Sequence, residues 1–369
     1  MTGSSESKDT PVVRLAAVGD LLLATDPVGG APTWGAGPRL EGVRGLLEGC
    51  DVVCGNLECT LPGSGETVPT EPRVVATPRL VRSVLENTFD VVSLANNHTF
   101  DCIEGGYHEV RDLLEEIGVP CFGAGDDLDG AAAPAILDVK GIRIAFLGAV
   151  DERAGAGQFA GPHQWGVAPL DVGRMTGAVR RLRRDMDHVV VSLHWGEERF
   201  LFPSPNQIEQ AHALAEAGAS LVLGHHPHVI QGMEIHDGVP IIYSLGNFVA
   251  CDVPFSDGDV MVWNRTERTG CLLTVDLAAD GTGNVVQTPT FDSGRTVELD
   301  ESGFGERRIA RANRALARGV TPAQYRREYF LVKTIKPVLD HLRWSRLKRL
   351  RLRNVRNALA GLFRGRKAE

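Results

Sequence analysis

The 369-residue sequence lacks any run of apolar residues close to the roughly 18 that a membrane-spanning helix requires. Its first eleven residues are polar and lack the apolar segment of a secretory signal, so we expect a cytoplasmic protein. The seven cysteines are odd in number and contain no Cys-x-x-Cys pair. These absences argue against an integral membrane protein, a disulfide framework and a zinc ribbon.

The charge of the chain is unevenly distributed. Residues 341–369 contain ten lysines and arginines against one acid, a net charge of +9. Since the whole chain carries −8, the first 340 residues carry −17. An acidic body followed by a basic tail indicates a molecule with two parts.

The basic tail also has apolar residues at helical spacing from Pro337 to Phe363. One interpretation is that this apolar face packs on the acidic body while the arginines reach solvent. The other is an interfacial helix, residues 337–369, that associates peripherally with an anionic membrane. Nucleic acid is a less favoured partner because no aromatic platform accompanies the basic residues.

Apolar, β-branched runs alternate with segments of helical spacing, which predicts an α/β protein whose sheet is at least partly parallel. The predicted strands are residues 12–18, 52–54, 91–94, 142–147, 188–193, 221–223 and 241–245, with a closing antiparallel pair at 271–276 and 284–290. The predicted helices are residues 78–86, 104–117, 171–186 and 206–217. Of two long loops, the glycine-rich residues 151–169 either cover an active site or lie on the surface, and we assign no role to residues 250–270.

Five short motifs place oxygen or imidazole groups directly after predicted strands. They are Gly19-Asp20, Gly55-Asn56-Leu57-Glu58, Ala95-Asn96-Asn97-His98, His194-Trp195-Gly196 and Gly224-His225-His226-Pro227-His228. Because the strand ends of an open α/β sheet form one crevice, these distant groups are expected to converge. Each motif alone could be a polar turn, but five of them indicate a common site.

The chemistry of these groups favours a metal centre. Three histidines within four positions, at 225, 226 and 228, would repel one another and resist burial unless a cation uses their lone pairs. Imidazole, carboxylate and amide oxygen without thiolate favour manganese, iron or zinc. The number of candidate ligands suits two divalent ions, which predicts hydrolysis.

At these motifs, and at Ser244-Leu245-Gly246-Asn247-Phe248, the sequence resembles the CapA (poly-γ-glutamate capsule biosynthesis) proteins of the metallo-dependent, calcineurin-like phosphoesterase superfamily. The resemblance spans residues 13 to about 250. It implies a two-sheet β-sandwich flanked by helices, with four α/β/β/α layers. We expect this domain at residues 12–300, after a disordered N-terminus at 1–11 and before a basic helical extension at 301–369.

The resemblance also implies roles for individual residues. The implied metal ligands are Asp20, Asn56, Glu58, Asn97, His194, His226 and His228. His98 is similar to the general acid of the superfamily, and Asp101 could orient its imidazole. His225, Glu198 and Asn247 are predicted to bind substrate. The sequence departs from the wider superfamily at Leu22, where a histidine is usual.

Two functions of different classes remain open. The first is a metal-dependent hydrolase, with two ions, that acts on an amide or a phosphate ester in polymer or metabolite biosynthesis. Its substrate would be a small molecule or a peptide-like, polyglutamate-like chain with γ-glutamyl bonds. The second is a non-catalytic polymer-binding or assembly factor of a capsule or cell-envelope synthesis complex.

Overall fold

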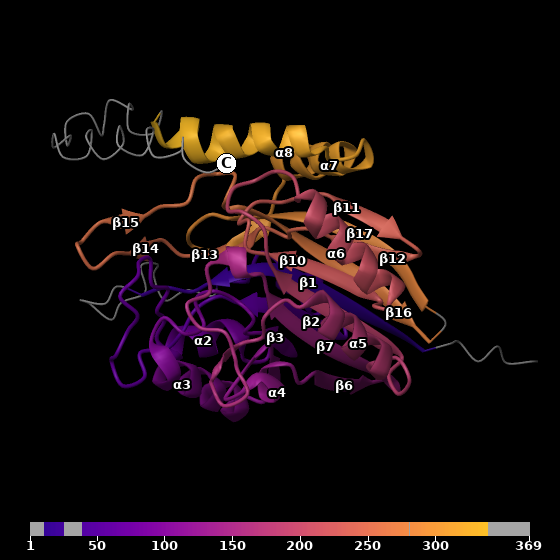
Figure 1. The fold of residues 1–369 in the computed structure, drawn as a ribbon, viewed down its shortest axis with the longest axis horizontal. Helices are drawn as coiled ribbons and strands as arrows, with labels where there is room; N and C mark the ends of the chain where they lie inside the picture. Colours follow the sequence, from indigo (N-terminus) through magenta and orange to yellow (C-terminus); the bar gives the residue numbers. More distant parts are fainter. Residues whose placement is uncertain (1–10, 26–38, 280, 339–369) are drawn as a thin grey trace, which may run out of the picture. The chain divides into compact units, whose positions relative to one another are not determined.

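The computed structural model describes residues 11–25, 39–279 and 281–338. The chain divides into two compact units, of which the first ends at Gly319 and the second begins at Val320. Every predicted site residue belongs to the first unit, whose strands and helices are shown in Figure 1. Apart from Pro11, the N-terminus predicted to be disordered lies outside the described residues.

The first sheet has eight strands in the order β18-β17-β16-β1-β2-β3-β4, and β13 pairs with β1 as well. Strands β1 to β4 and β13 pair in parallel, whereas β16, β17 and β18 extend the sheet in antiparallel fashion. The bounds are β1 Val12–Leu22, β2 Val52–Leu57, β3 Val91–Ser93, β4 Cys121–Phe122, β13 Asn247–Ala250, β16 Thr269–Ala278, β17 Gly281–Asp292 and β18 Val297–Leu299.

The second sheet has six strands in the order β11-β12-β10-β9-β7-β6. Its four inner strands are parallel, and β11 and β6 close its edges in antiparallel pairing. The bounds are β6 Ala135–Val139, β7 Ile142–Val150, β9 His188–His194, β10 Leu221–His225, β11 Met233–His236 and β12 Val239–Ile242. Two small two-stranded sheets join β5 Ala124–Gly125 to β8 Gly166–Val167 and β14 Val253–Pro254 to β15 Val260–Met261.

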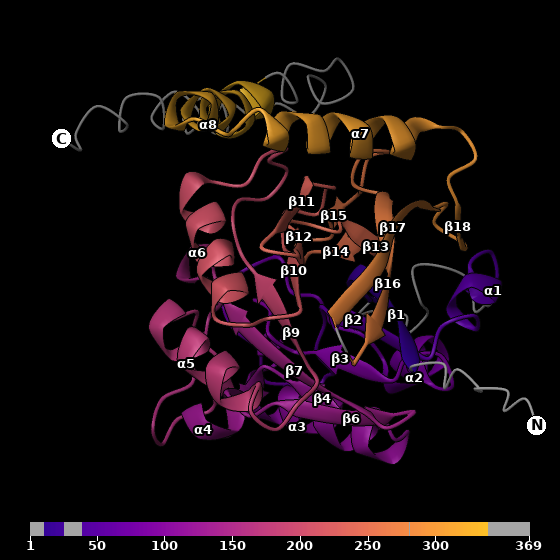
Figure 2. The same cartoon turned by 90° about the vertical axis from the view of Figure 1, so that its right-hand side faces the viewer.

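The helices of the first unit lie outside the two sheets. Helices α5 and α6 are neighbours in both views, and α6 contacts β10 of the second sheet (Figure 2). The bounds are α1 Arg44–Leu47, α2 Pro78–Leu85, α3 Ile103–Glu116, α4 Leu128–Ala131, α5 Val172–Leu182, α6 Pro205–Glu216 and α7 Phe304–Ala317, with a 3₁₀ turn η1 at Glu152–Ala154.

Strand β1 is buried on both faces. Leu15 belongs to a core cluster that also contains Ile144 and Val190 of the second sheet. Val18, on the other face, belongs to a cluster that contains Val81 of α2 and Val110 of α3. A strand covered on both faces needs apolar residues at successive positions, which explains the continuous apolar run. The predicted α/β two-sheet sandwich flanked by helices is therefore confirmed.

The strand predicted at residues 241–245 exists as β12, Val239–Ile242, but it ends three residues earlier than predicted. Strand β12 ends at Ile242 in the second sheet, and β13 begins at Asn247 in the first. Gly246 between them has a φ of +71°, which a residue with a side chain rarely adopts. Because Tyr243 and Leu245 are fully buried while the chain crosses between the sheets, the apolar pattern carries no sign of the crossing.

Helix α7 belongs to the first unit, so the compact body extends past the boundary expected at residue 300. Asn313 of α7 accepts a hydrogen bond from the main-chain N–H of Met233 in β11 (2.8 Å) and donates one to Gln287 in β17 (2.8 Å). These bonds connect the helix to both sheets.

The second unit begins with α8, Pro322–Tyr329, and continues as a π-helical segment, Phe330–Ile335. Thr321 caps α8, and its side chain accepts a hydrogen bond from the main chain of Gln324. The predicted basic helix covers residues 337–369. Its residues 339–369 lie outside the described residues. Among the described helices, none combines the length and apolar character needed to cross a membrane.

Candidate metal centre

The predicted site residues converge where strands of both sheets end. Asp20 of β1 lies in register with Asn56 of β2 and with Asn247 of β13. In the second sheet, His194 at the end of β9 lies in register with His225 at the end of β10. Since neighbouring strands run parallel, their carboxyl ends meet at one edge, as the motifs predicted.

Asp20 reaches this edge because the chain makes a very close approach at the preceding glycine. A Cβ on Gly19 would lie 1.8 Å from the carbonyl oxygen of Gly246, so only glycine fits. The buried Asp20 carboxylate accepts hydrogen bonds from Asn56 Nδ2 (2.8 Å) and from the main-chain N–H of His226 (3.2 Å). Burial raises the pKa of Asp20, but hydrogen bonds from His225 and His228 outweigh it and hold that pKa well below its usual range.

Glu58 has the surroundings expected of a residue that binds a cation. Its side chain is fully buried, and within the described part of the chain neither carboxylate oxygen has a hydrogen-bond partner. Glu58 Oε1 lies 3.7 Å from His194 Nε2, 3.9 Å from His228 Nε2 and 4.0 Å from His98 Nε2. Burial, together with the charge of Asp20, raises the pKa of Glu58 to about 8. A buried carboxylate without partners is costly unless a positive charge compensates it.

Two of the histidines are suited to act as neutral ligands. Burial, with the nearby charge of His226, lowers the pKa of His194 far below its usual value, and burial lowers that of His226 to about 4. Their ring nitrogens His226 Nδ1 and His194 Nε2 lie 3.1 Å apart. A metal-binding imidazole must be unprotonated, so these pKa directions favour ligation.

His228 differs from its neighbours. Burial lowers its pKa, but the negative charges of Glu58 and Asp20 raise it to about 10. His226 and His228 both have positive φ values, +91° and +56°, and this turn brings both rings toward Glu58. A bound divalent cation would add positive charge and oppose protonation of both Glu58 and His228.

The candidate ligands form two groups that share one residue. In each group, the potential ligand atoms lie within 4.8 Å of one another. The groups are Asp20, Glu58 and His194, and Glu58, His226 and His228. Asn97 Oδ1 adds an amide oxygen 2.7 Å from His194 Nε2. Carboxylate, imidazole and amide groups without thiolate fit a divalent cation of the manganese, iron or zinc type.

His98 and Asp101 form a pair beside these ligands. His98 Nδ1 donates to Asp101 Oδ2 (2.7 Å), which also accepts the main-chain N–H of Val74 (2.8 Å). Burial lowers the pKa of His98, but the negative charge of Asp101 outweighs it and raises the pKa overall. The amide nitrogen of Asn97 can only donate, so His98 Nε2, 3.1 Å away, accepts its hydrogen bond while Nδ1 carries the proton shared with Asp101. Asp101 therefore orients the ring and raises its pKa.

The amide of Asn56 makes hydrogen bonds within the protein. Its nitrogen donates to Asp20, and its oxygen accepts from Asn96 Nδ2 (3.1 Å). Asn96 also donates to the Leu57 carbonyl (2.8 Å) and accepts the main-chain N–H of His98 (3.1 Å). Asn96 thus ties the second motif to the third, a structural role that sequence reasoning did not assign to it.

The three residues predicted to bind substrate have different surroundings. His225 is buried, and its Nδ1 lies 3.1 Å from Asp20 Oδ1. Asn247 is also buried and contacts His228. Glu198 is partly buried, and its negative charge acts on the pKa values of His226 and His228.

Both long loops reach the neighbourhood of the centre. In the first, Trp165 stacks on Phe100, two residues beyond His98, with ring centroids 4.9 Å apart. In the second, the ring of Trp263 lies 5.1 Å from that of His228. The contact of Trp263 had no local signal in the sequence, because the two residues are far apart along the chain.

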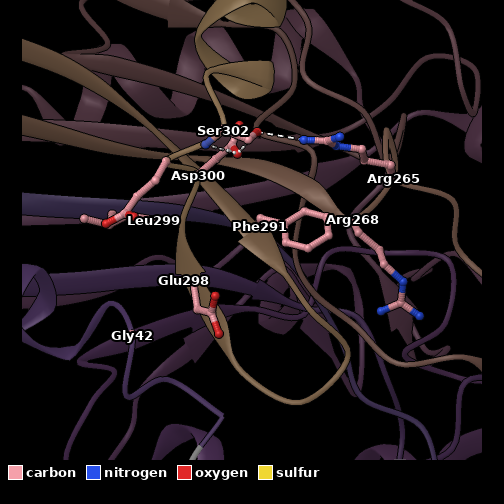
Figure 3. Close-up of a pocket in the computed structure, with 9 residues that line it drawn as sticks. Gly42, Arg265, Arg268, Phe291, Glu298, Leu299, Asp300 and Ser302 are labelled. Atoms are coloured by element: carbon pink, nitrogen blue, oxygen red, sulfur yellow. Dashed lines mark hydrogen bonds between the residues drawn. The ribbon is translucent and has the colours of Figure 1, made fainter.

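A cavity of about 770 Å³ lies apart from the candidate metal centre (Figure 3). Among the described residues, no predicted site residue lines this cavity. Arg265 and Arg268 reach it from the second long loop. Arg265 donates to Ser302 Oγ (2.7 Å), and Arg268 pairs with Asp252 (2.7 Å). Both guanidinium groups therefore have partners on the protein.

The fold and the cluster define a two-sheet α/β protein with histidines and carboxylates gathered at its strand ends. Residues 14–251 match the model of the family described as bacterial capsule synthesis protein PGA_cap. The chain therefore belongs to this family, and the predicted resemblance to CapA proteins is confirmed.

Two CapA proteins agree with this assignment. The chain is 31% identical over 284 residues to the PGA biosynthesis protein CapA of Bacillus subtilis (strain 168), covering 75% of this chain and 71% of that protein. It is 29% identical over 283 residues to the capsule biosynthesis protein CapA of Bacillus anthracis, covering 74% and 66%. A phosphatase structure from Mycoplasma pneumoniae aligns with a TM-score of 0.45 and 11% identity, over 79% of this chain and 96% of that one.

Proposed function

We propose that the chain is a metal-dependent hydrolase whose catalytic centre is the cluster around Glu58. The single observation that carries this proposal is the fully buried Glu58 carboxylate, which lacks hydrogen-bond partners among the described residues and faces three imidazoles. The proposed ligands are Asp20, Glu58, Asn97, His194, His226 and His228. Because the candidate ligands form two groups with Glu58 in both, these residues would hold two ions.

A divalent metal bound at these residues supplies Lewis acidity, which polarises the bond under attack and activates water. Asp20 is held for ligation by Asn56 and His225, which we propose as orienting residues. We assign the protonation of the leaving group to His98, since Asp101 orients its ring and raises its pKa. Five of the six proposed ligands are buried, and Asn97 is partly exposed.

For the substrate, we propose a γ-glutamyl or similar peptide-like amide, with a phosphate ester as the alternative. Support for an amide comes from the family and from the name of the Bacillus subtilis relative, a PGA biosynthesis protein. A non-catalytic role in polymer assembly is the competing function.

Hydrolysis of a substrate panel tests the proposal. We expect protein loaded with manganese, iron or zinc to hydrolyse either γ-glutamyl anilides or aryl phosphates, and chelation to abolish that activity. Glu58→Gln keeps the size of the side chain but removes its charge, and it should lack the activity. If the loaded wild-type protein does no more than Glu58→Gln on every substrate, the hydrolase is refuted and the assembly role is favoured.

We further propose that residues 337–369 associate peripherally with anionic membrane. The support is the charge pattern of the sequence, in which each lysine or arginine near the surface would contribute about 1 kcal/mol. Full-length protein should co-sediment with anionic but not neutral vesicles, and truncation at Asp340 should abolish the binding. Equal sedimentation of the full-length and truncated proteins at low salt would contradict the proposal.

A further inference from the structure

Asn247 was predicted to bind substrate, but its surroundings indicate another role. It begins β13, lies in register with Asp20 and is 1% exposed. Asn247 Nδ2 donates to the main-chain carbonyl of Glu267 (3.0 Å), and Asn247 Oδ1 lies 2.9 Å from His228 Nδ1. Both polar atoms of the amide are therefore bonded to the protein.

The first of these bonds determines the direction of the second. A main-chain carbonyl can only accept, so the amide nitrogen of Asn247 must face Glu267 and its oxygen must face His228. An amide oxygen also only accepts, so His228 Nδ1 must carry the proton and donate. The Asp20 carboxylate, 3.4 Å from the same nitrogen, is a second and more distant acceptor for that proton. His228 Nε2 is left as the ring nitrogen available to a metal, and it lies 3.9 Å from Glu58 Oε1.

The loop that carries Glu267 is itself held firmly. The Glu267 side chain is buried, and its carboxylate accepts hydrogen bonds from Arg199 Nε (2.5 Å) and from the main-chain N–H of Asn264 (2.9 Å). The main-chain N–H of Arg199 in turn donates to the carbonyl of Pro227, in the turn that carries His228 (2.8 Å). The acceptor for Asn247 and the His228 turn are thus fixed to each other.

We propose that Asn247 is a positioning residue that fixes the proton of His228 on Nδ1 and presents Nε2 to the metal. The inference rests on the proposed metal centre. It also gives a role to the loop at residues 250–270, for which the sequence predicted none, because Glu267 in this loop holds the Asn247 amide. Hydrogen-bond partners of metal-binding histidines orient the ring, and losing one typically weakens metal affinity by about 10–100-fold.

Metal affinity of the full chain, measured by competition with a chelator for Zn²⁺ and Co²⁺, tests the proposal. Asn247→Ala should bind about 10–100-fold more weakly than wild type, and its Co²⁺ absorption bands should shift at saturation. Asn247→Asp keeps an acceptor for His228 Nδ1 but loses the donor to Glu267, so it should recover much of the affinity. Circular dichroism of each variant checks that it has folded.

Asn313→Ala is the matched control. Asn313 also makes one bond to a main-chain group and one to a side chain, but it does so on α7, away from the centre. Its removal should leave metal affinity unchanged. If Asn247→Ala binds metal as wild type does, or if Asn247→Asp binds no better than Asn247→Ala, the positioning role is overturned. Failure of wild type to bind metal would overturn the metal centre as well, so the two failures are distinguishable.

Discussion

The double variant His226→Ala with His228→Ala is expected to bind clearly less manganese, iron or zinc at the centre after loading than the wild type does. Both imidazoles belong to one of the two ligand groups that share Glu58. Without them, that group keeps Glu58 alone, while the group of Asp20, Glu58 and His194 remains. Elemental analysis of the loaded, desalted protein measures the effect.

The control replaces two other histidines that also face carboxylates. His108 lies 2.8 Å from Asp126, and His212 lies 2.8 Å from Glu234. Neither belongs to the two ligand groups that share Glu58. His108→Ala with His212→Ala should keep the wild-type metal content. The assignment of ligands is wrong if the first double variant keeps its metal, or if the control loses as much.

Replacing His98 by alanine is expected to lower kcat by about 10²–10⁴, the usual contribution of a general acid, with metal content nearly intact. The reason is that Asp101 orients the His98 ring and raises its pKa, which favours the protonated imidazole that a general acid requires. Steady-state kinetics on the substrate that wild type hydrolyses, together with metal analysis of the same samples, measure both quantities.

His108→Ala provides the comparison, because it removes another histidine–carboxylate pair from an exposed position. It should leave kcat unchanged. Loss of metal from His98→Ala would make His98 a ligand instead of an acid. An unchanged kcat would remove it from the chemistry altogether.

The sequence alone was sufficient for the main architecture and for the family. Residues 188–193, apolar except for His188 and Ser192, form most of β9, because a strand covered on both faces is built mainly from apolar side chains. The ligand candidates were recognisable for a related reason. Polar groups such as Asp20, Glu58 and His194 directly follow buried strands, and parallel strands bring their ends together whatever the details of packing.

Tertiary structure alone decided what the polar groups around the ligands do. Asn247 and His225 looked like substrate-binding residues, but one contacts His228 and Glu267 and the other contacts Asp20. Whether a polar side chain meets a ligand or another part of the protein depends on neighbours from distant segments. The packing of the two sheets sets those neighbours here, since the chain crosses from one sheet to the other just before Asn247 and periodicity does not reveal the crossing.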